Sequence, residues 1–452
     1  MSNKNTAIAI EFKGSKTYRC IVREANILKV IVIGGGWAGC SAAITAKKAG
    51  AEVALYERTD MLLGLGNVGG IMRNNGRYAA AEEMIALGTG ELINLTDQNS
   101  KHKNIDFPGH KNAWLCDTNK IEPAVVKYLK DMDIEVNMIA RVVDIKIEDN
   151  KIKGIYLSDK KYVEADVFIE TTGSTGPMNN CTKYGNGCVM CVLRCPTFGG
   201  RVSISSKAGI EDLKGEREDG GYGAFSGSCK LAKGSLSIDI VKTLDEVGVV
   251  VIQVPKEDVN LDKLKLKVCQ QYALKEFAEN IILIDTGDVK LMTPYYPLEK
   301  LRKIKGLENA RYIDPYSGGV GNSIRYVSIA PRTDDMKVLG VDNLFCAGEK
   351  AGLFIGHTEA MITGALAGQN AVRNYLELPL LILPRALAVG DIIAYANEKI
   401  KTKEGRINRY TFSGAEYFKR MQEIGLYILD IDKIKQKVEG LNLTNIFNEK
   451  FI

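Results

Sequence analysis

The segment LKVIVIGGGWAG, residues 28–39, decides the fold of this chain. It opens with an almost entirely apolar run, as expected of a buried parallel strand. Gly34, Gly36 and Gly39 follow in the spacing G-x-G-x-x-G. A helix of small residues and a second strand, which ends at Glu57, are expected next. The segment therefore predicts a βαβ unit at the start of an α/β fold.

The three glycines have separate roles in a dinucleotide-binding turn. The first allows the tight turn, the second lets the backbone approach a pyrophosphate, and the third lets the helix pack against the strand. The first helical turn would place the N–H groups of Trp37 and Ala38 near the phosphates. Glu57, followed by Arg58, stands about 20 residues further on, where an acid binds ribose hydroxyls. The competing interpretation is a glycine-rich turn without a ligand.

Two later segments have the same strand-then-glycine character. Thr171-Thr172-Gly173 follows a strand expected over 165–170, after a hairpin over 141–157 that includes Val143. The segment NLFCAGE, residues 343–349, leads from a strand into a turn at Gly348 and Glu349. A helix is expected to begin near His357 and Thr358.

Together these pieces resemble the two-dinucleotide-binding-domain flavoprotein superfamily. The resemblance implies that FAD is the cofactor, with Thr172 and Gly173 at its border and Glu349 near its ribityl chain. It also implies that the helix beginning at His357 and Thr358 points its N-terminus at the flavin ring. No second G-x-G-x-x-G follows a strand, so a dedicated NAD(P)H domain is expected to be absent.

Further motifs resemble two tRNA-modifying flavoenzymes within that superfamily. Residues 301–310 are similar to a stretch of the folate- and FAD-dependent tRNA uridine methyltransferase. Residues 348–371 are similar to the ending shared by that enzyme and the GidA-type wobble-uridine enzyme. Gly69 and Gly70 stand in a V-G-G-I segment that resembles the I-G-G-I of the GidA type. This chain has Gly64 where the GidA type has a reactive cysteine.

Four cysteines form a cluster after the second glycine turn. Cys181, Cys188, Cys191 and Cys195 have the spacing C-x₆-C-x₂-C-x₃-C, and Pro196 follows. The last three match the end of a bacterial ferredoxin pattern, which predicts a [4Fe–4S] cluster that passes electrons to or from the flavin. A structural zinc site, a redox-active dithiol of Cys188 and Cys191, and unrelated thiols are the alternatives.

A few other residues were considered for catalysis or binding. His357 is a candidate proton donor because imidazole titrates near neutral pH. Cys229 is a candidate nucleophile, with an inert buried thiol as the alternative. His102 and His110 are expected in a solvated polar loop. Arg194 and Arg201 flank the cysteine cluster and are candidates for binding an anionic substrate or stabilising the charge of reduced sulfur, with a surface role in solubility as the favoured alternative.

The α/β pattern suggests how the chain is divided. A Rossmann-like FAD-binding domain of the three-layer glutathione-reductase type is expected over 28–176 and 340–379. An α+β substrate domain would be inserted at 177–339, with an N-terminal hairpin within 1–27 and a small helical domain over 380–452.

Composition restricts the function classes only weakly. A net charge of +5 over 452 residues permits an anionic substrate or RNA and demands neither. No apolar run reaches the roughly 20 residues of a membrane helix, so a cytoplasmic protein is expected, and a homo-oligomer is left open.

Three functional hypotheses follow. The first is an FAD-dependent oxidoreductase that acts on a small-molecule substrate or an electron carrier, with the cysteine cluster as relay. The second is a flavin- and folate-dependent enzyme that modifies uridine in RNA. The third is a flavin-binding sensor without turnover.

Overall fold

The computed structural model describes residues 27–174, 195–216, 220, 224–225, 229–265, 273–293, 296–313, 324–325 and 327–452. The predicted N-terminal hairpin and the cysteines at 181, 188 and 191 lie outside these residues.

A five-stranded parallel sheet forms the centre of the fold, in the order β19-β10-β1-β2-β6. Its strands are β1 (Lys29–Ile33), β2 (Glu52–Tyr56), β6 (Glu135–Asn137), β10 (Val167–Glu170) and β19 (Leu344–Cys346). β1 lies between β2 and β10, which explains why its sequence is nearly all apolar. The predicted βαβ unit is therefore present. The strand predicted before the turn at Gly348 is β19, which joins the same sheet.

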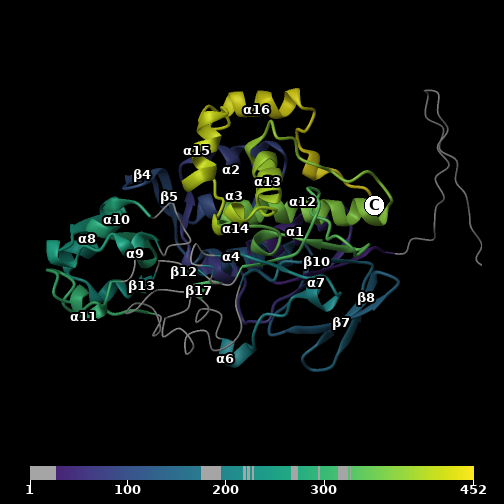
Figure 1. The fold of residues 1–452 in the computed structure, drawn as a ribbon, viewed down its shortest axis with the longest axis horizontal. Helices are drawn as coiled ribbons and strands as arrows, with labels where there is room; N and C mark the ends of the chain where they lie inside the picture. Colours follow the sequence, from purple (N-terminus) through teal and green to yellow (C-terminus); the bar gives the residue numbers. More distant parts are fainter. Residues whose placement is uncertain are drawn as a thin grey trace, which may run out of the picture.

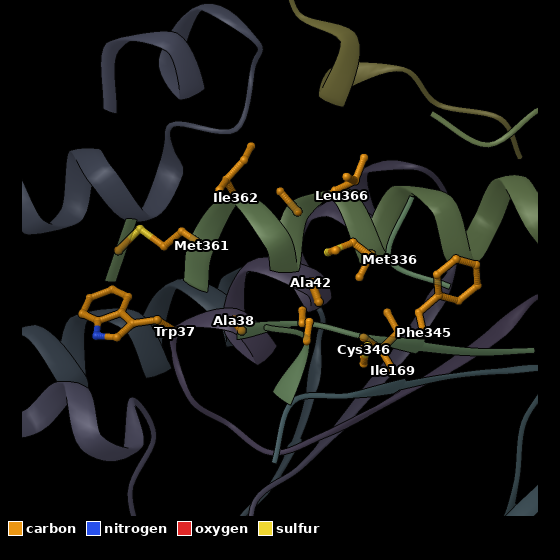
Figure 2. Close-up of a cluster of buried hydrophobic side chains, with 14 of the residues drawn as sticks. Trp37, Ala38, Ala42, Ile169, Met336, Phe345, Cys346, Met361, Ile362 and Leu366 are labelled. Carbon is orange, nitrogen blue, oxygen red and sulfur yellow. The ribbon is translucent and has the colours of Figure 1, made fainter. Parts of the chain in front are cut away.

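Two long helices pack against each other beside this sheet. They are α1 (Trp37–Lys48) and α12 (His357–Tyr375), and α12 begins where the sequence predicts. Gly364 and Gly368 of α12 face α1, because a Cβ atom at either would lie 2.1 or 2.3 Å from the carbonyl oxygen of Ala38 or Ala42. In Figure 2, Ile362 and Leu366 project from the other side of α12. Small residues at the crossing allow the two backbones to approach closely, so the two helix N-termini are held together.

The described residues also form three antiparallel sheets of three or four strands. The hairpin predicted over 141–157 forms a sheet of β7 (Val142–Glu148), β8 (Lys151–Leu157) and β9 (Tyr162–Glu164). A second sheet, in the order β3-β5-β4, holds β3 (Ile71–Arg73), β4 (Ser100–Phe107) and β5 (His110–Cys116). The third, in the order β13-β16-β15-β14, holds β13 (Cys229–Leu231), β14 (Val249–Gln253), β15 (Asn280–Thr286) and β16 (Asp288–Leu291). Two-stranded pairs join β11 (Leu213–Lys214) to β18 (Ser328–Ile329) and β12 (Ala224–Phe225) to β17 (Ile324–Arg325).

The four-stranded sheet lies within the predicted inserted domain and has its own hydrophobic core. The packing of this sheet crosses the predicted domain boundary, because Leu115 of β5 shares a hydrophobic cluster with Phe277 and Ile284. The segment over 100–116 therefore packs with the insert, although the sequence places it in the FAD-binding domain.

The remaining helices cover these sheets and form the C-terminal region (Figure 1). They are α2 (Gly76–Ala86), α3 (Glu91–Gln98), α4 (Ile121–Asp131), α6 (Cys195–Phe198), α7 (Ile204–Lys207), α8 (Ile238–Val247), α9 (Asp262–Lys265), α10 (Lys275–Glu279), α11 (Leu298–Leu301), α13 (Ala388–Lys399), α14 (Lys403–Ile407), α15 (Ala415–Glu423) and α16 (Ile431–Gly440). The chain end returns to α1, where the amide of Phe451 donates to the carbonyl of Ala49. Within the described residues, no helix combines the length and apolarity that crossing a bilayer requires.

Candidate functional site

A cavity opens at the carboxyl ends of the parallel strands, where open α/β sheets bind their ligands. Residues that end β1, β2, β10 and β19, or directly follow them, line it: Ile33, Gly34, Tyr56, Glu57, Thr171 and Ala347. Other walls come from loops and helix starts: Gly36, Trp37, Ala38, Arg58, Leu63, Gly64, Leu65, Gly66, Val68, Gly69, Ile71, Arg77, Ala140, Arg141, Val142, Thr172, Gly173, Ser174, Gly200, Arg201, Val202, Gly348, Glu349, Lys290, Ile355, Gly356, His357 and Ala360. Three glycine turns that are far apart in the sequence thus meet in one cavity.

The first turn presents the N-terminus of α1 to the cavity. Gly36 precedes the helix, and no side chain caps it. A Cβ atom at Gly36 would have no atom within 4 Å, so this backbone borders open space. The hydroxyl of Thr171 donates to the carbonyl of Gly34 at 2.6 Å and joins the first turn to the second. Backbone N–H groups at an uncapped helix N-terminus suit a phosphate ligand.

The Glu57 carboxylate is held in a fixed orientation at the wall. One oxygen accepts from the amide of Gly35 at 2.7 Å, and the other accepts from the amide of Thr59 at 2.8 Å. The side chain is only slightly exposed. Its position matches that of an acid that binds ribose hydroxyls.

The second and third turns meet through a hydrogen bond from Ser174 Oγ to the carboxylate of Glu349. A buried ionic network lies behind them. Lys350 Nζ is 2.6 Å from Asp212 Oδ2 and 3.6 Å from Glu170 Oε1. Burial by itself raises the pKa of Asp212, but Lys350 and the hydroxyls around it bring that pKa below its usual range. Lys350, Asp212 and Glu170 were not predicted as site residues, although a glutamate that ends an apolar strand is a visible signal.

Arginine side chains fix the segment that follows the cysteine cluster. Arg58 donates to the carbonyl of Gly199, and Arg141 Nε donates to the carbonyl of Gly200 at 2.9 Å. Arg201 donates to the carbonyl of Gly173 and is 10% exposed. The favoured interpretation of Arg201 as a surface residue was therefore wrong, and its alternative role in binding an anion stays a prediction. Burial lowers its pKa, and it lines the cavity together with its neighbours Gly200 and Val202.

The far end of the cavity is formed by the start of α12. The rings of Trp37 and His357 meet edge to face, with centroids 5.7 Å apart. A Cβ atom at Gly69 would lie 2.2 Å from Nε2 of His357, so a larger residue there would displace the His357 ring. Lys290 reaches the same loop from β16 and donates to the carbonyls of Val68 and Gly69 at 3.0 and 2.9 Å. Lys290 was not predicted as a site residue.

Comparison with known proteins identifies the family. The family described as glucose inhibited division protein A matches residues 29–282 and 284–379. The chain belongs to this family. The predicted resemblance and the α/β Rossmann-type FAD-binding fold are thereby confirmed.

The curated relatives include tRNA-modifying enzymes. A tRNA uridine 5-carboxymethylaminomethyl modification enzyme MnmG from Ureaplasma parvum is 29% identical over 167 residues, or 35% of this chain and 26% of the relative. An MnmG from Alkaliphilus metalliredigens is 23% identical over 503 aligned residues, which cover 94% of this chain and 77% of the relative. A methylenetetrahydrofolate–tRNA-(uracil-5-)-methyltransferase TrmFO from Dictyoglomus thermophilum is 33% identical over 105 residues, 23% of each chain. The match thus spans about a quarter of the Ureaplasma enzyme's length.

A solved structure agrees on the fold. GidA from Aquifex aeolicus superimposes with a TM-score of 0.65 at 16% identity, over 95% of this chain and 74% of that one. This glucose inhibited division protein A family member therefore has the family's architecture over most of its length.

Most of the residues predicted to bind the cofactor line the cavity of this family member: Gly34, Gly36, Trp37, Ala38, Glu57, Arg58, Gly69, Thr172, Gly173, Gly348, Glu349 and His357. The other four are placed differently. Gly39 lies behind the wall, where a Cβ atom would be 1.9 Å from the carbonyl oxygen of Gly34. Gly70 faces Thr286, and Thr358 is buried. Val143 follows the lining residue Val142 in β7, where the register with β8 shifts, and is not among the residues that line the cavity.

The predicted metal site lies mostly outside the described residues. Cys195 begins α6 and Cys229 begins β13, but neither side chain is described. In the described part of the chain, no group of three or more potential ligands could hold a metal ion. Burial raises the pKa of Cys116 and of Cys346 to about 12. The iron–sulfur, zinc and nucleophile hypotheses stay predictions.

Two histidines expected in a solvated loop are packed instead. His110 is buried, stacks on Phe107 with centroids 4.4 Å apart and contacts Asn74. His102 lies 3.0 Å from the buried carboxylate of Asp285. Both predictions were wrong because residues 100–116 form two strands that pack against the inserted sheet.

Proposed function

We propose that this protein is an FAD-dependent enzyme that modifies uridine in tRNA. Its family and the names of its MnmG and TrmFO relatives support this activity. The observation that carries the proposal is the convergence of three glycine turns and two helix N-termini on one cavity.

The lining residues fit FAD from end to end. Glu57 would accept hydrogen bonds from the adenosine ribose, and the start of α1 would face the pyrophosphate. Glu349 and Gly173 would border the ribityl chain, where a Cβ atom at Gly173 meets nothing within 4 Å. The start of α12 would face the ring, with His357 as a candidate proton donor beside it. Bound FAD would supply two-electron redox chemistry, and the protein would orient it and exclude water.

The cofactor is tested by releasing it from the purified full chain. Acid-denatured protein should yield about one equivalent of FAD by chromatography, and G36V should yield little, because a larger side chain would occupy the open space beside Gly36. A folded protein that binds no FAD under reconstitution would refute the proposal.

The substrate is tested on unmodified tRNA transcripts. The enzyme is incubated with reduced flavin and a folate-derived one-carbon donor, and the digested nucleosides are analysed by mass spectrometry. A uridine mass increase that requires both FAD and the donor would support the proposal. Electron transfer to small acceptors without any modified nucleoside would favour an oxidoreductase.

A second candidate function is an FAD-dependent oxidoreductase with an iron–sulfur relay. Gly173 and Ser174, which precede residues 175–194 in the sequence, line the cavity, and so do Gly200 and Arg201, which follow them. Its cysteines at 181, 188 and 191, with Cys195, carry the ferredoxin-like spacing. The lining position aligned with the GidA-type cysteine is Gly64, which also favours chemistry other than that of the relatives.

Metal and sulfide analysis of anaerobically purified protein distinguishes an iron–sulfur cluster from a zinc site and from a dithiol at these cysteines. About four iron and four sulfide per chain, lost in C188A/C191A and kept in C20A, would support the relay. Cys20 serves as the control because it lies in the predicted N-terminal hairpin, far from the cluster in the sequence. About one zinc would indicate a structural site, and no metal would leave the dithiol of Cys188 and Cys191. A flavin that undergoes no turnover with any donor would instead favour a sensor.

A further inference from the structure

Lys290 brings a cationic side chain from the inserted sheet to the far end of the cavity. The residue belongs to β16, is 5% exposed and lines the cavity. Its ammonium group donates to the carbonyls of Val68 and Gly69. These bonds hold the loop that contacts His357 through Gly69.

The sheet places a second lysine directly opposite. Lys230 of β13 pairs with Lys290 in the antiparallel register, so the two side chains lie on the same face. Lys230 Nζ donates to Thr118 at 2.8 Å and does not line the cavity. Burial lowers its pKa. Like charges opposite each other in a sheet are unfavourable, so this placement costs stability.

Proteins tolerate such a loss of stability at functional sites, so the pairing of Lys230 with Lys290 indicates that the charge of Lys290 has a role at the cavity. The N-terminus of α12 contributes a partial positive charge at the same end of the cavity. Lys290 adds a full charge from another element, in surroundings that exclude much of the water that would screen it. The N-terminus of α12 and Lys290 would both favour an anionic group at this end of the cavity.

We propose that Lys290 is a positioning residue of the flavin site: it holds the 68–69 loop and favours the reduced, anionic cofactor. The inference rests on the proposed FAD site. Oxidised flavin that takes up two electrons from a reductant and one proton from solvent gains one negative charge. The charge of Lys290 therefore stabilises the reduced form relative to the oxidised form.

The experiment compares the flavin reduction potential of the wild type, K290M, K290R and K230M. Each is titrated anaerobically with dithionite against a reference dye, and FAD content and thermal unfolding are measured alongside. K290M should shift the equilibrium at least tenfold toward oxidised flavin, about 30 mV for a two-electron couple. K290R should restore most of the shift, and K230M should shift it less than threefold.

The outcomes separate the two proposals. Wild-type protein that binds no FAD would overturn both. Normal FAD content with the same potential in wild type and K290M would overturn the role of Lys290 alone. Equal shifts in K290M and K230M would also overturn it, since a general change in the sheet would then explain both. If K290M does not fold, the comparison of K290R with K290Q decides, and equal potentials in those two variants would refute the role.

Discussion

The carbonyl oxygen of Ala38 lies 2.1 Å from the position that a Cβ atom would occupy at Gly364. The close atom on α1 belongs to the backbone, so it cannot rotate away as a side chain could. The two helices both begin at the cavity. The spacing between them therefore sets the spacing of two walls of the site.

Replacing Gly364 with alanine should separate α1 from α12. Overpacking of this kind costs about 1–3 kcal/mol, and we expect that loss in the free energy of unfolding by urea, together with weaker FAD binding. G440A is the matched control, because nothing lies within 4 Å of a Cβ atom at Gly440 near the end of α16. It should be neutral or more stable by up to about 1 kcal/mol. Equal stability of G364A and wild type would contradict the close crossing.

Replacing Glu57 with glutamine should weaken FAD binding and leave FMN binding unchanged. The variant keeps the side-chain shape but loses the charged acceptor for the ribose of the adenosine half, and its single oxygen can accept from only one of the Gly35 and Thr59 amides. We expect the dissociation constant for FAD to rise about tenfold, which corresponds to about 1.4 kcal/mol. Fluorescence titration of apoprotein with each flavin measures this. A similar rise for FMN would show that the substitution disturbs the fold instead.

Glu83 should make stability fall as the pH rises through the weakly acidic range. Burial raises its pKa from 4.5 to about 7, although the amides of Ala388 and Val389 at the start of α13 donate to it. Between those values the folded chain holds a proton that the unfolded chain has released, so stability decreases with increasing pH. The difference corresponds to roughly 3 kcal/mol.

The substitution E83Q should remove this contribution. Urea unfolding of wild type and E83Q at several pH values between 4.5 and 7.5 isolates it from other titrating groups. We expect wild type to lose stability relative to E83Q across this range. Parallel pH profiles for the two proteins would refute the assignment.

Asp285 should be needed to dock β4 on the inserted sheet. The buried carboxylate lies 2.8 Å from Lys101, 3.0 Å from His102 and 3.0 Å from Lys233. Although burial acts in the other direction, the hydrogen bonds from these groups lower its pKa. D285N should cost about 3 kcal/mol by denaturation, because cations would lose their buried partner.

The control for Asp285 is D106N. Asp106 pairs with Lys111 at the surface, and exposed pairs contribute at most about 1 kcal/mol. Comparable losses in D285N and D106N would show that the buried cluster adds nothing beyond a surface pair.

The sequence by itself determined the elements that local patterns encode. The apolar run before Gly34 became β1, the hairpin over 141–157 became β7 and β8, and α12 begins at His357 as expected. Strand and helix periodicity and glycine spacing act over a few residues, so they can be read without knowing the fold.

The tertiary structure alone decided which side chains meet at the site. Lys290 reaches Gly69 across more than 200 residues of sequence, and Lys350 meets Asp212 across more than 100. His110 and Arg201 are polar residues in polar stretches, and only the packing of distant segments buries them. Burial and charge pairing depend on contacts between segments that no local pattern specifies, which is the physical reason why these residues escaped prediction.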